Sequence, residues 1–305
     1  MLQIIADGLI IGSVISLGAI GLSLTLSIMR FSNFSHGELL GWGSYLALSA
    51  SAAFTAAHAS LATPLGPFSF GWGLLAALAV ASVLTALLAL LLDQLLFRRL
   101  RKQGFITLVI ASFGAALALR NLLLFWYGGV PQYYSQNLQI SIPLVPRAVA
   151  GGLRVTADQL LVLALTLVTV TGLHLFLRYS TLGRSMRASS LNPALARVSG
   201  IDPERVLRAT RIIGGLLAAV AGVFAGITVQ LRPTMGVDLL LPLFAAVILG
   251  GVGSVWGAVL GGFIVGLAES ASVSVVGAEY RAAAAFVVLI LILLVRPTGL
   301  LGEKH

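Results

Sequence analysis

Residues Leu39 to Leu92 read LLGWGSYLALSASAAFTAAHASLATPLGPFSFGWGLLAALAVASVLTALLALLL, which is 54 consecutive positions without a formally charged side chain. A helix needs only about 20 apolar residues to cross a bilayer, so this stretch is too long for one span. Its middle holds His58 and the turn signal Pro64-Leu65-Gly66-Pro67. The pattern therefore predicts two membrane spans, near residues 37–57 and 71–96.

The composition of the whole chain is that of a membrane protein. Of its 305 residues, 58% are hydrophobic and only 10% are charged, and the mean hydropathy is +1.03. An ordinary soluble domain carries about 25% charged residues. A soluble protein of this size could not cover its surface with so few charges, and the composition excludes the soluble, disordered and fibrous classes.

Six further hydrophobic segments bring the predicted total to about eight. Five of them fit one span each, at residues 8–29, 104–125, 157–177, 211–230 and 281–295. The sixth, Leu239–Ala268, has 30 residues without a charge, and as one straight helix it would measure about 45 Å against a bilayer core of about 30 Å. It also contains Gly250-Gly251-Val252-Gly253, which favours a break. The predicted fold is all-α, a polytopic transmembrane helical bundle with at least one broken or re-entrant segment.

The positive charges are concentrated in two loops. Four lie at residues 98–102 and seven at residues 178–211, together 11 of the 19 basic residues. Both loops are predicted to be cytoplasmic and the loop 126–156 between them external, because basic loops stay inside. The net charge of +9 is thus interpreted as a topology signal, and no nucleic-acid partner is predicted. The side of the N-terminus stays open, because residues 30–38 could be a loop between two spans or a break within the membrane.

The loop at residues 178–210 is polar and carries signals for short helices. Asn192 is suited to cap a helix that has Pro193 in its first position, and Gly200 is suited to end that helix. Asp202-Pro203 predicts a second cap, for a helix that continues into the next span. A short helix at this place could lie on anionic lipid or dock onto a soluble partner, and the residues alone do not separate the two interpretations.

Residue types that several chemistries require are missing. The chain has no cysteine and its four histidines are far apart, so no metal and no other cofactor is predicted. Its two lysines, Lys102 and Lys304, do not end a G-x-x-x-x-G-K-[ST] run, so the sequence has no P-loop. The chain is therefore not expected to be an enzyme or to hydrolyse ATP itself.

Four separate stretches carry motifs that are specific when they occur together. They are IMRFSNFSHGEL at 28–39, the loop from Gly183 to Ile201, AVILGGVGSVWGA at 246–258, and Arg296-Pro297-Thr298-Gly299-Leu300. In this order, over nearly the whole chain, they resemble the permease subunits of branched-chain amino acid ABC transporters, the Liv type.

This resemblance implies a single transmembrane permease domain, residues 1–305, in the bacterial plasma (inner) membrane. It implies an importer in which the chain and a second permease subunit, homologous or identical, form the translocation pathway within membrane lipid. Cytoplasmic ATP-binding subunits would power transport, and a periplasmic or extracellular substrate-binding protein would deliver the amino acid. The ATPase-coupling residues would be those of the 178–210 loop: Arg187, Asn192, Pro193, Ala196, Arg197 and Gly200.

Two other segments are candidates for the substrate pathway. Polar side chains at membrane depth tend to face a cavity or one another, and the first segment offers Ser32, Asn33, His36 and Glu38. The alternative for this segment is a surface loop that caps the next helix through Ser35. The second segment offers Gly250, Gly251, Gly253 and Ser254. Its favoured alternative is tight helix packing.

Other cargoes and mechanisms stay open. A permease of this type could carry urea or short amides, because nothing in the chain specifies the cargo. An ion-coupled secondary transporter is the less favoured class, since it would need buried carboxylates in several spans and the central spans have almost none. A membrane enzyme would need more than the pair His36 and Glu38.

Overall fold

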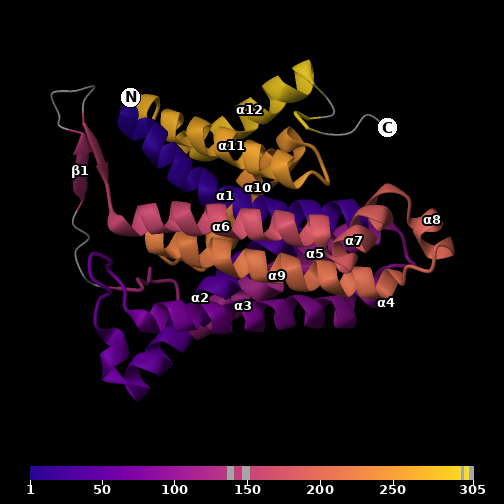
Figure 1. Cartoon of the computed structure of the whole chain (residues 1–305), viewed down its shortest axis with the longest axis horizontal. Coiled ribbons are helices and arrows are strands. Elements are labelled where there is room, and N and C mark those ends of the chain that lie inside the picture. The colour runs from indigo at the N-terminus through magenta and orange to yellow at the C-terminus, as the bar shows by residue number, and fades with distance from the viewer. Residues whose placement is uncertain (136–140, 146–151, 297–298, 302–305) are drawn as a thin grey trace.

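The computed structural model of the chain describes residues 1–135, 141–145, 152–296 and 299–301. Figure 1 shows an elongated bundle in which most helices run roughly along the long axis. Three residues that entered the sequence argument lie outside the described residues: Pro297, Thr298 and Lys304.

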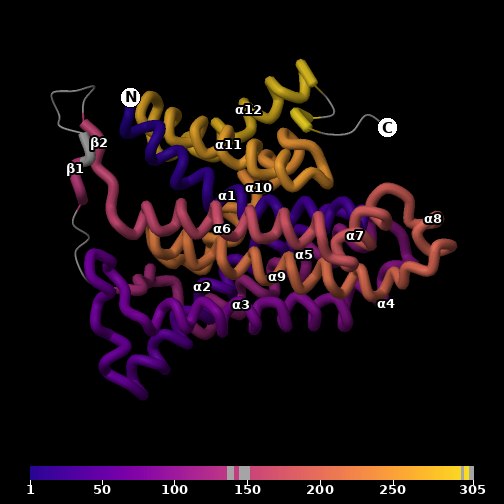
Figure 2. Tube along the Cα trace, viewed as in Figure 1, coloured from indigo at the N-terminus to yellow at the C-terminus, as the bar shows by residue number. Residues whose placement is uncertain are grey.

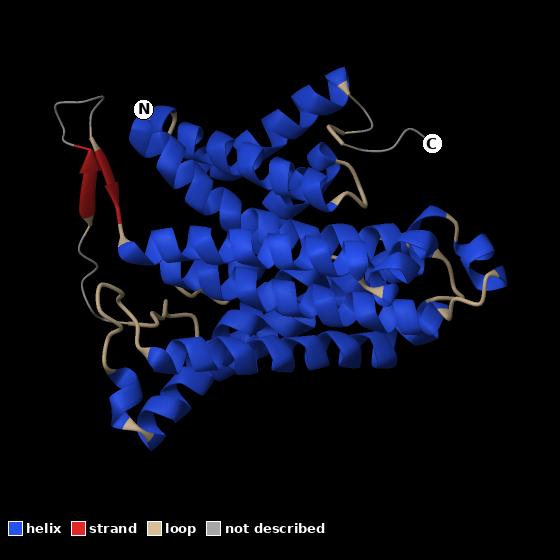
Figure 3. Ribbon diagram, viewed as in Figure 1, coloured by secondary structure: helices blue, strands red, loops and turns tan. Residues whose placement is uncertain are grey.

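The elements follow one another as an almost entirely helical series (Figure 3). In order they are α1 (Leu2–Met29), α2 (Ser35–Ala57), η1 (Ala59–Ala62), α3 (Trp72–Leu92), the π-helical η2 (Asp93–Phe97), α4 (Arg98–Leu100), α5 (Phe105–Tyr127), β1 (Ile142–Val145), β2 (Leu153–Val155), α6 (Ala157–Tyr179), α7 (Thr181–Leu191), α8 (Pro193–Val198), α9 (Pro203–Thr228), α10 (Met235–Gly250), α11 (Val255–Val275), η3 (Ala278–Tyr280) and α12 (Arg281–Val295). Seven helices of the described residues are long and apolar enough to cross a membrane. The prediction of an all-α polytopic bundle is confirmed.

Helix α1 is the central helix. In Figure 2 its indigo trace runs from the N-terminus into the middle of the bundle, and most of its residues are buried against α9 and α11. Small residues let α11 approach closely, since a Cβ atom on Gly266 would lie only 2.4 Å from the backbone nitrogen of Gly12. In lipid, where apolar burial between helices gains little, such backbone contact holds helices together.

The break predicted within Leu239–Ala268 is confirmed. The segment forms two helices, α10 and α11, which pack against each other across a turn at residues 251–254. Gly251 and Gly253 have φ angles of 99° and 87°, which only glycine adopts readily. Helix α10 has 16 residues, about 24 Å of helix, and is shorter than a bilayer core of about 30 Å. The eight predicted segments therefore correspond to nine helices of the described residues.

Helix α2 begins inside the bundle. The chain turns at Arg30, which has a φ of 55°, and then re-enters the protein. The His36 ring contacts Gly21 of α1. Gly21 lies eight residues before the end of α1, so this contact is about 12 Å along the helix from that end. Residues 30–38 therefore form a largely buried turn and helix start between α1 and α2, and their depth relative to the membrane surface stays a prediction. Within the bundle the polar side chains of Asn33, Ser35 and His36 have hydrogen-bond partners.

The N-terminus lies beside the β1–β2 hairpin. The Gln3 side chain donates to the Arg154 carbonyl at 3.1 Å and accepts from the Arg154 N–H at 3.0 Å. Figure 1 shows this end of the bundle opposite the end that carries α7 and α8. The N-terminus is thus on the side that the charge distribution predicts to be external.

Candidate functional site

The tip of the predicted cytoplasmic end is the short helix α8. The Asn192 side chain accepts from the N–H groups of Ala194 and Leu195 at 3.1 and 3.0 Å, and Pro193 occupies the first helical position. Gly200, with a φ of 83°, lets the chain leave the helix and turn toward α9. Asp202 caps α9, its carboxylate accepting from the Glu204 N–H at 2.9 Å. The caps predicted from sequence are confirmed.

The exposed face of α8 is apolar. Leu195 is 63% exposed and Val198 is 87% exposed, whereas Ala196 is buried at 5%. Of the predicted coupling residues, Asn192 and Arg197 are also exposed. Sequence reasoning included Ala196, which faces inward, and missed Leu195 and Val198. The sequence signal that could have identified them is their spacing: two apolar residues three positions apart lie on the same face of a short helix.

Arg187 is exposed, but its guanidinium makes hydrogen bonds within the chain. Its guanidinium turns back and donates to the backbone carbonyls of Leu177 and Arg178 at the end of α6. A cation at this place satisfies carbonyls that the helix leaves unpaired. The observed contacts of Arg187 therefore belong to the junction of α6 and α7.

The surface around α8 carries unbalanced positive charge. Among the described residues, six arginines of this region have no carboxylate within 4.0 Å: Arg178, Arg184, Arg187, Arg197, Arg205 and Arg208. The carboxylate of Glu204 is shared between Arg98 and Arg101. This end of the protein is therefore electrostatically suited to an acidic partner.

A buried ionic cluster joins α9 to η2 behind this surface. The Asp93 carboxylate accepts from Arg101 at 2.8 and 2.7 Å and from Arg211 at 3.2 Å. Arg101 also donates to Glu204 at 3.0 Å. The Arg211 guanidinium lies 4.6 Å from the centre of the Phe97 ring. The cluster therefore connects α9, which follows α8 in the chain, to η2, which follows α3.

Arg211 corrects the interpretation of the charged loop. It was counted with the cytoplasmic arginines, but its side chain is only 3% exposed and lies inside the bundle. The buried position is stabilised because Asp93 supplies the opposite charge. The signal in the sequence was Asp93 itself, the one carboxylate within the predicted 71–96 span.

The re-entrant segment places its polar side chains in separate contacts. Asn33 accepts from the hydroxyl and the N–H of Ser35 at 2.7 and 3.3 Å, so it caps the start of α2. His36 donates from Nε2 to the Gly18 carbonyl at 3.1 Å. The carbonyl of Ser32 accepts from Ser112 at 3.4 Å. His36 thus ties the start of α2 to α1, and Ser32 ties the preceding residues to α5.

Glu38 is the residue of this segment with unused bonding capacity. It is only 3% exposed, and its Oε2 has no hydrogen-bond partner among the described residues. It lies against Gly236 at the start of α10, and the charges that act on it are Arg120 of α5 and Asp238 of α10. Glu38 is therefore placed where α2, α5 and α10 meet.

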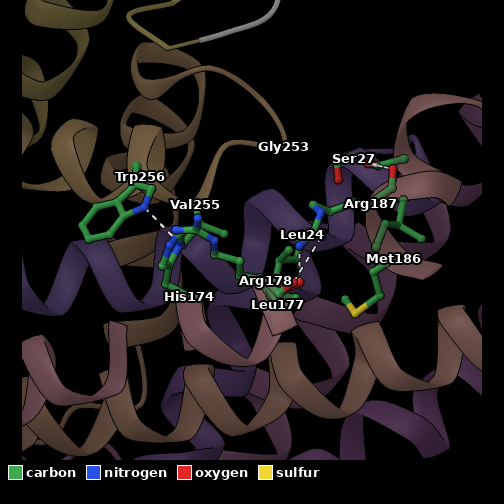
Figure 4. A pocket seen from close by; sticks show the side chains of 12 residues that line it. Leu24, Ser27, His174, Leu177, Arg178, Met186, Arg187, Gly253, Val255 and Trp256 are labelled. Atoms are coloured by element: carbon green, nitrogen blue, oxygen red, sulfur yellow. Dashed lines mark hydrogen bonds between the residues drawn. The ribbon is translucent and has the colours of Figure 1, made fainter. Parts of the chain in front are cut away.

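The glycine-rich turn makes close packing contacts. A Cβ atom on Gly250 would lie 2.0 Å from the Gly257 carbonyl oxygen. The Ser254 hydroxyl accepts from the Gly257 N–H at 3.0 Å and caps α11, and the Gly253 N–H donates to Ser23 at 3.0 Å. Of the four predicted pathway residues here, Gly250 ends α10, whereas Gly251, Gly253 and Ser254 form the turn. Gly253 also lines the cavity shown in Figure 4.

Together these features define a class of protein, a polytopic helical membrane protein with a helix exposed at its basic end. The family model described as branched-chain amino acid transport system / permease component matches residues 4–295. The chain belongs to this family of transport permeases.

Relatives support the same assignment over their full length. The high-affinity branched-chain amino acid transport system permease protein BraD of Pseudomonas aeruginosa is 33% identical, with 100% of this chain and 96% of BraD covered. LivH of Escherichia coli K12, a protein of the same description, is 31% identical, with 100% and 96% covered. The probable branched-chain amino acid transport permease protein LivH of Methanocaldococcus jannaschii is 26% identical, with 98% and 92% covered. The family resemblance and the localisation as a multi-pass protein of the bacterial inner membrane are confirmed.

Proposed function

We propose that the chain is the transmembrane permease subunit of an ATP-binding cassette importer for branched-chain or related amino acids. The observation that carries the proposal is the family match over residues 4–295. The chain acts as one permease domain with loop 178–210 in the cytoplasm and loop 126–156 outside. A second permease subunit completes the pathway, and a substrate-binding protein delivers the cargo to the outer face.

ATP hydrolysis belongs to separate cytoplasmic subunits. The chain has no P-loop. The exposed apolar residues of α8 lie in a region whose arginines mostly have no carboxylate within 4.0 Å among the residues that the structure describes. An apolar patch with a basic rim suits a groove with acidic edges on an ATP-binding subunit. Helix α8 is therefore the docking element, with Leu195, Val198, Asn192 and Arg197 on its outer surface.

The ionic cluster gives this docking element a mechanical connection. Helix α8 leads through Gly200 and Asp202 directly into α9. Glu204 and Arg211 of α9 are tied to Arg101 and Asp93, so displacement of α8 by the ATP-binding subunits moves α9 and η2 together. The rigid packing of α9 on α1 and α2 then carries the displacement to the start of α2.

The docking role of α8 is tested by the double substitution Leu195→Asp and Val198→Asp. Both side chains are exposed, so the fold should be retained, and two buried acids at the interface should lower co-purification of the ATP-binding subunit about tenfold or more. The matched control is Val130→Asp, which adds an acid to an exposed apolar position at the other end of the bundle. Unchanged co-purification of the double variant would overturn the assignment. Ala196 is unsuitable for this test because it is buried.

The pathway role is assigned to Glu38. Its Oε2 has no hydrogen-bond partner in the part of the chain that the structure describes, and it lies against Gly236 of α10. A carboxylate at membrane depth suits the ammonium group of an amino acid. Ser32, Asn33 and His36 position it by fixing the start of α2, and the turn at Gly250, Gly251, Gly253 and Ser254 is the flexible element of the same pathway.

Substituting Glu38→Gln should lower transport about tenfold or more while leaving assembly intact, because it keeps the shape and removes the charge. The measurement is uptake of a labelled branched-chain amino acid by the assembled transporter. The control is Glu279→Gln at an exposed position of η3. Full uptake by the Glu38→Gln variant would show that the carboxylate has no part in the pathway.

A further inference from the structure

A cavity of about 220 Å³ opens toward the predicted cytoplasmic end, between α1, α6, α7 and the start of α11. Figure 4 shows Arg178 extending along it toward His174 and Trp256, while Arg187 turns back onto the end of α6. Pockets for drug-sized ligands measure about 300–1,000 Å³, so this one fits a smaller group. None of its lining residues is acidic.

The His174 and Trp256 pair directs a hydrogen-bond donor at this cavity. Trp256 Nε1 lies 3.1 Å from His174 Nδ1, and an indole N–H can only donate. His174 Nδ1 is therefore the acceptor, and the neutral ring carries its proton on Nε2. Among the described residues, no hydrogen-bond partner takes that Nε2 proton. The ring thus presents a fixed N–H donor.

Two further features make the cavity attractive to an anion. The Arg178 guanidinium has no carboxylate within 4.0 Å among the described residues. Val255 and Trp256 are the first residues of the 21-residue helix α11, whose N-terminal end carries partial positive charge. The residues that carry a guanidinium and an imidazole N–H and the first residues of a long helix thus line one cavity.

The depth of the cavity matches the headgroup region of the cytoplasmic leaflet. His174 lies five residues before the end of α6, about 7.5 Å along the helix. Tyr179 at the end of α6 and Leu260 on α11 are exposed, as expected for helix surfaces that face lipid. Aromatic residues and basic pockets at this level are typical of contact with anionic phospholipid.

We infer that this cavity binds the phosphate group of an anionic phospholipid of the cytoplasmic leaflet, such as phosphatidylglycerol. The phosphate oxygens accept hydrogen bonds from Arg178 and His174. The glycerol carbons lie against the apolar wall formed by Leu24, Met186 and Val255. The bound lipid would bridge α6 and α11, which both pack against α1.

The test is native mass spectrometry of the purified full chain with phosphatidylglycerol or phosphatidylcholine added in equal amounts. The wild-type protein should retain phosphatidylglycerol about fivefold or more over phosphatidylcholine, and Arg178→Gln should reduce its retention about fivefold, because a charge-assisted bond is lost. The control Arg184→Gln removes an equally exposed charge that does not line the cavity, and its retention should stay within about twofold of wild type.

A second variant and a competitor separate the remaining explanations. Trp256→Phe keeps the aromatic body but frees His174, so retention should fall about twofold or more. Equal losses in the two arginine variants would show general surface charge and overturn the site. Displacement of the lipid by millimolar inorganic phosphate would assign the cavity to a free anion instead. Unchanged retention in both Arg178→Gln and Trp256→Phe would also overturn the inference.

Discussion

Substituting Asp93→Asn is expected to lower the free energy of unfolding by about 3–5 kcal/mol, the usual cost of leaving a buried charge without its partner. Asp93 is the shared acceptor of Arg101 and Arg211, and Arg211 is buried at 3% exposure. The amide keeps the size of the carboxylate but cannot balance two guanidinium groups. Thermal or denaturant unfolding of the purified protein in detergent measures the loss.

Two comparisons make this result specific to the cluster. Arg98→Gln removes an exposed charge that lies 3.9 Å from Glu204, and it should change stability by about 1 kcal/mol or less. The double variant Asp93→Asn with Arg211→Met removes the buried charge together with its partner and should recover part of the loss. If the Asp93→Asn variant has the same free energy of unfolding as the Arg98→Gln variant, the cluster does not hold α9 to η2.

Substituting Gly257→Ala should destabilise the α10–α11 pair by about 1–3 kcal/mol, the range seen for overpacked positions, and should abolish transport. A Cβ atom at this position would lie 2.2 Å from the Gly250 carbonyl oxygen. Both partners are backbone, so neither can rotate out of the way and the two helices must separate. Unfolding and uptake of the variant are the two measurements.

The matched control is Gly114→Ala in α5, where a new Cβ atom would meet no atom within 4 Å. This variant should be neutral or more stable by about 0.5–1 kcal/mol, because alanine favours helix over glycine. Equal stability of Gly114→Ala and Gly257→Ala would contradict the backbone contact. Loss of transport in Gly257→Ala with unchanged stability would contradict the packing explanation and would support the pathway role proposed above for this turn.

Features that depend on local sequence were predictable. The spans follow from runs of apolar residues, the α10–α11 break follows from Gly251 and Gly253, and the α8 caps follow from Asn192 and Gly200. Each of these signals lies within a few residues of the structure that it determines. No partner from elsewhere in the chain is needed to interpret them.

Features that depend on distant contacts were not predictable. The sequence around Arg211 indicates an exposed cytoplasmic charge, because its partner Asp93 lies 118 positions away in the chain. The burial of Ala196 and the exposure of Val198 depend on how a six-residue helix sits on the bundle, which its short pattern does not fix. The re-entry of residues 30–34 likewise depends on Gly18 and Gly21 accommodating His36.

The most direct measurement is uptake of a labelled branched-chain amino acid into proteoliposomes that contain the permease, its ATP-binding subunits and the substrate-binding protein. We expect uptake to require ATP and to be lost in the Leu195→Asp and Val198→Asp double variant, while Val130→Asp transports normally. Uptake by the chain alone along an ion gradient, or ATP-driven uptake that the α8 double variant leaves unchanged, would contradict a permease driven through α8.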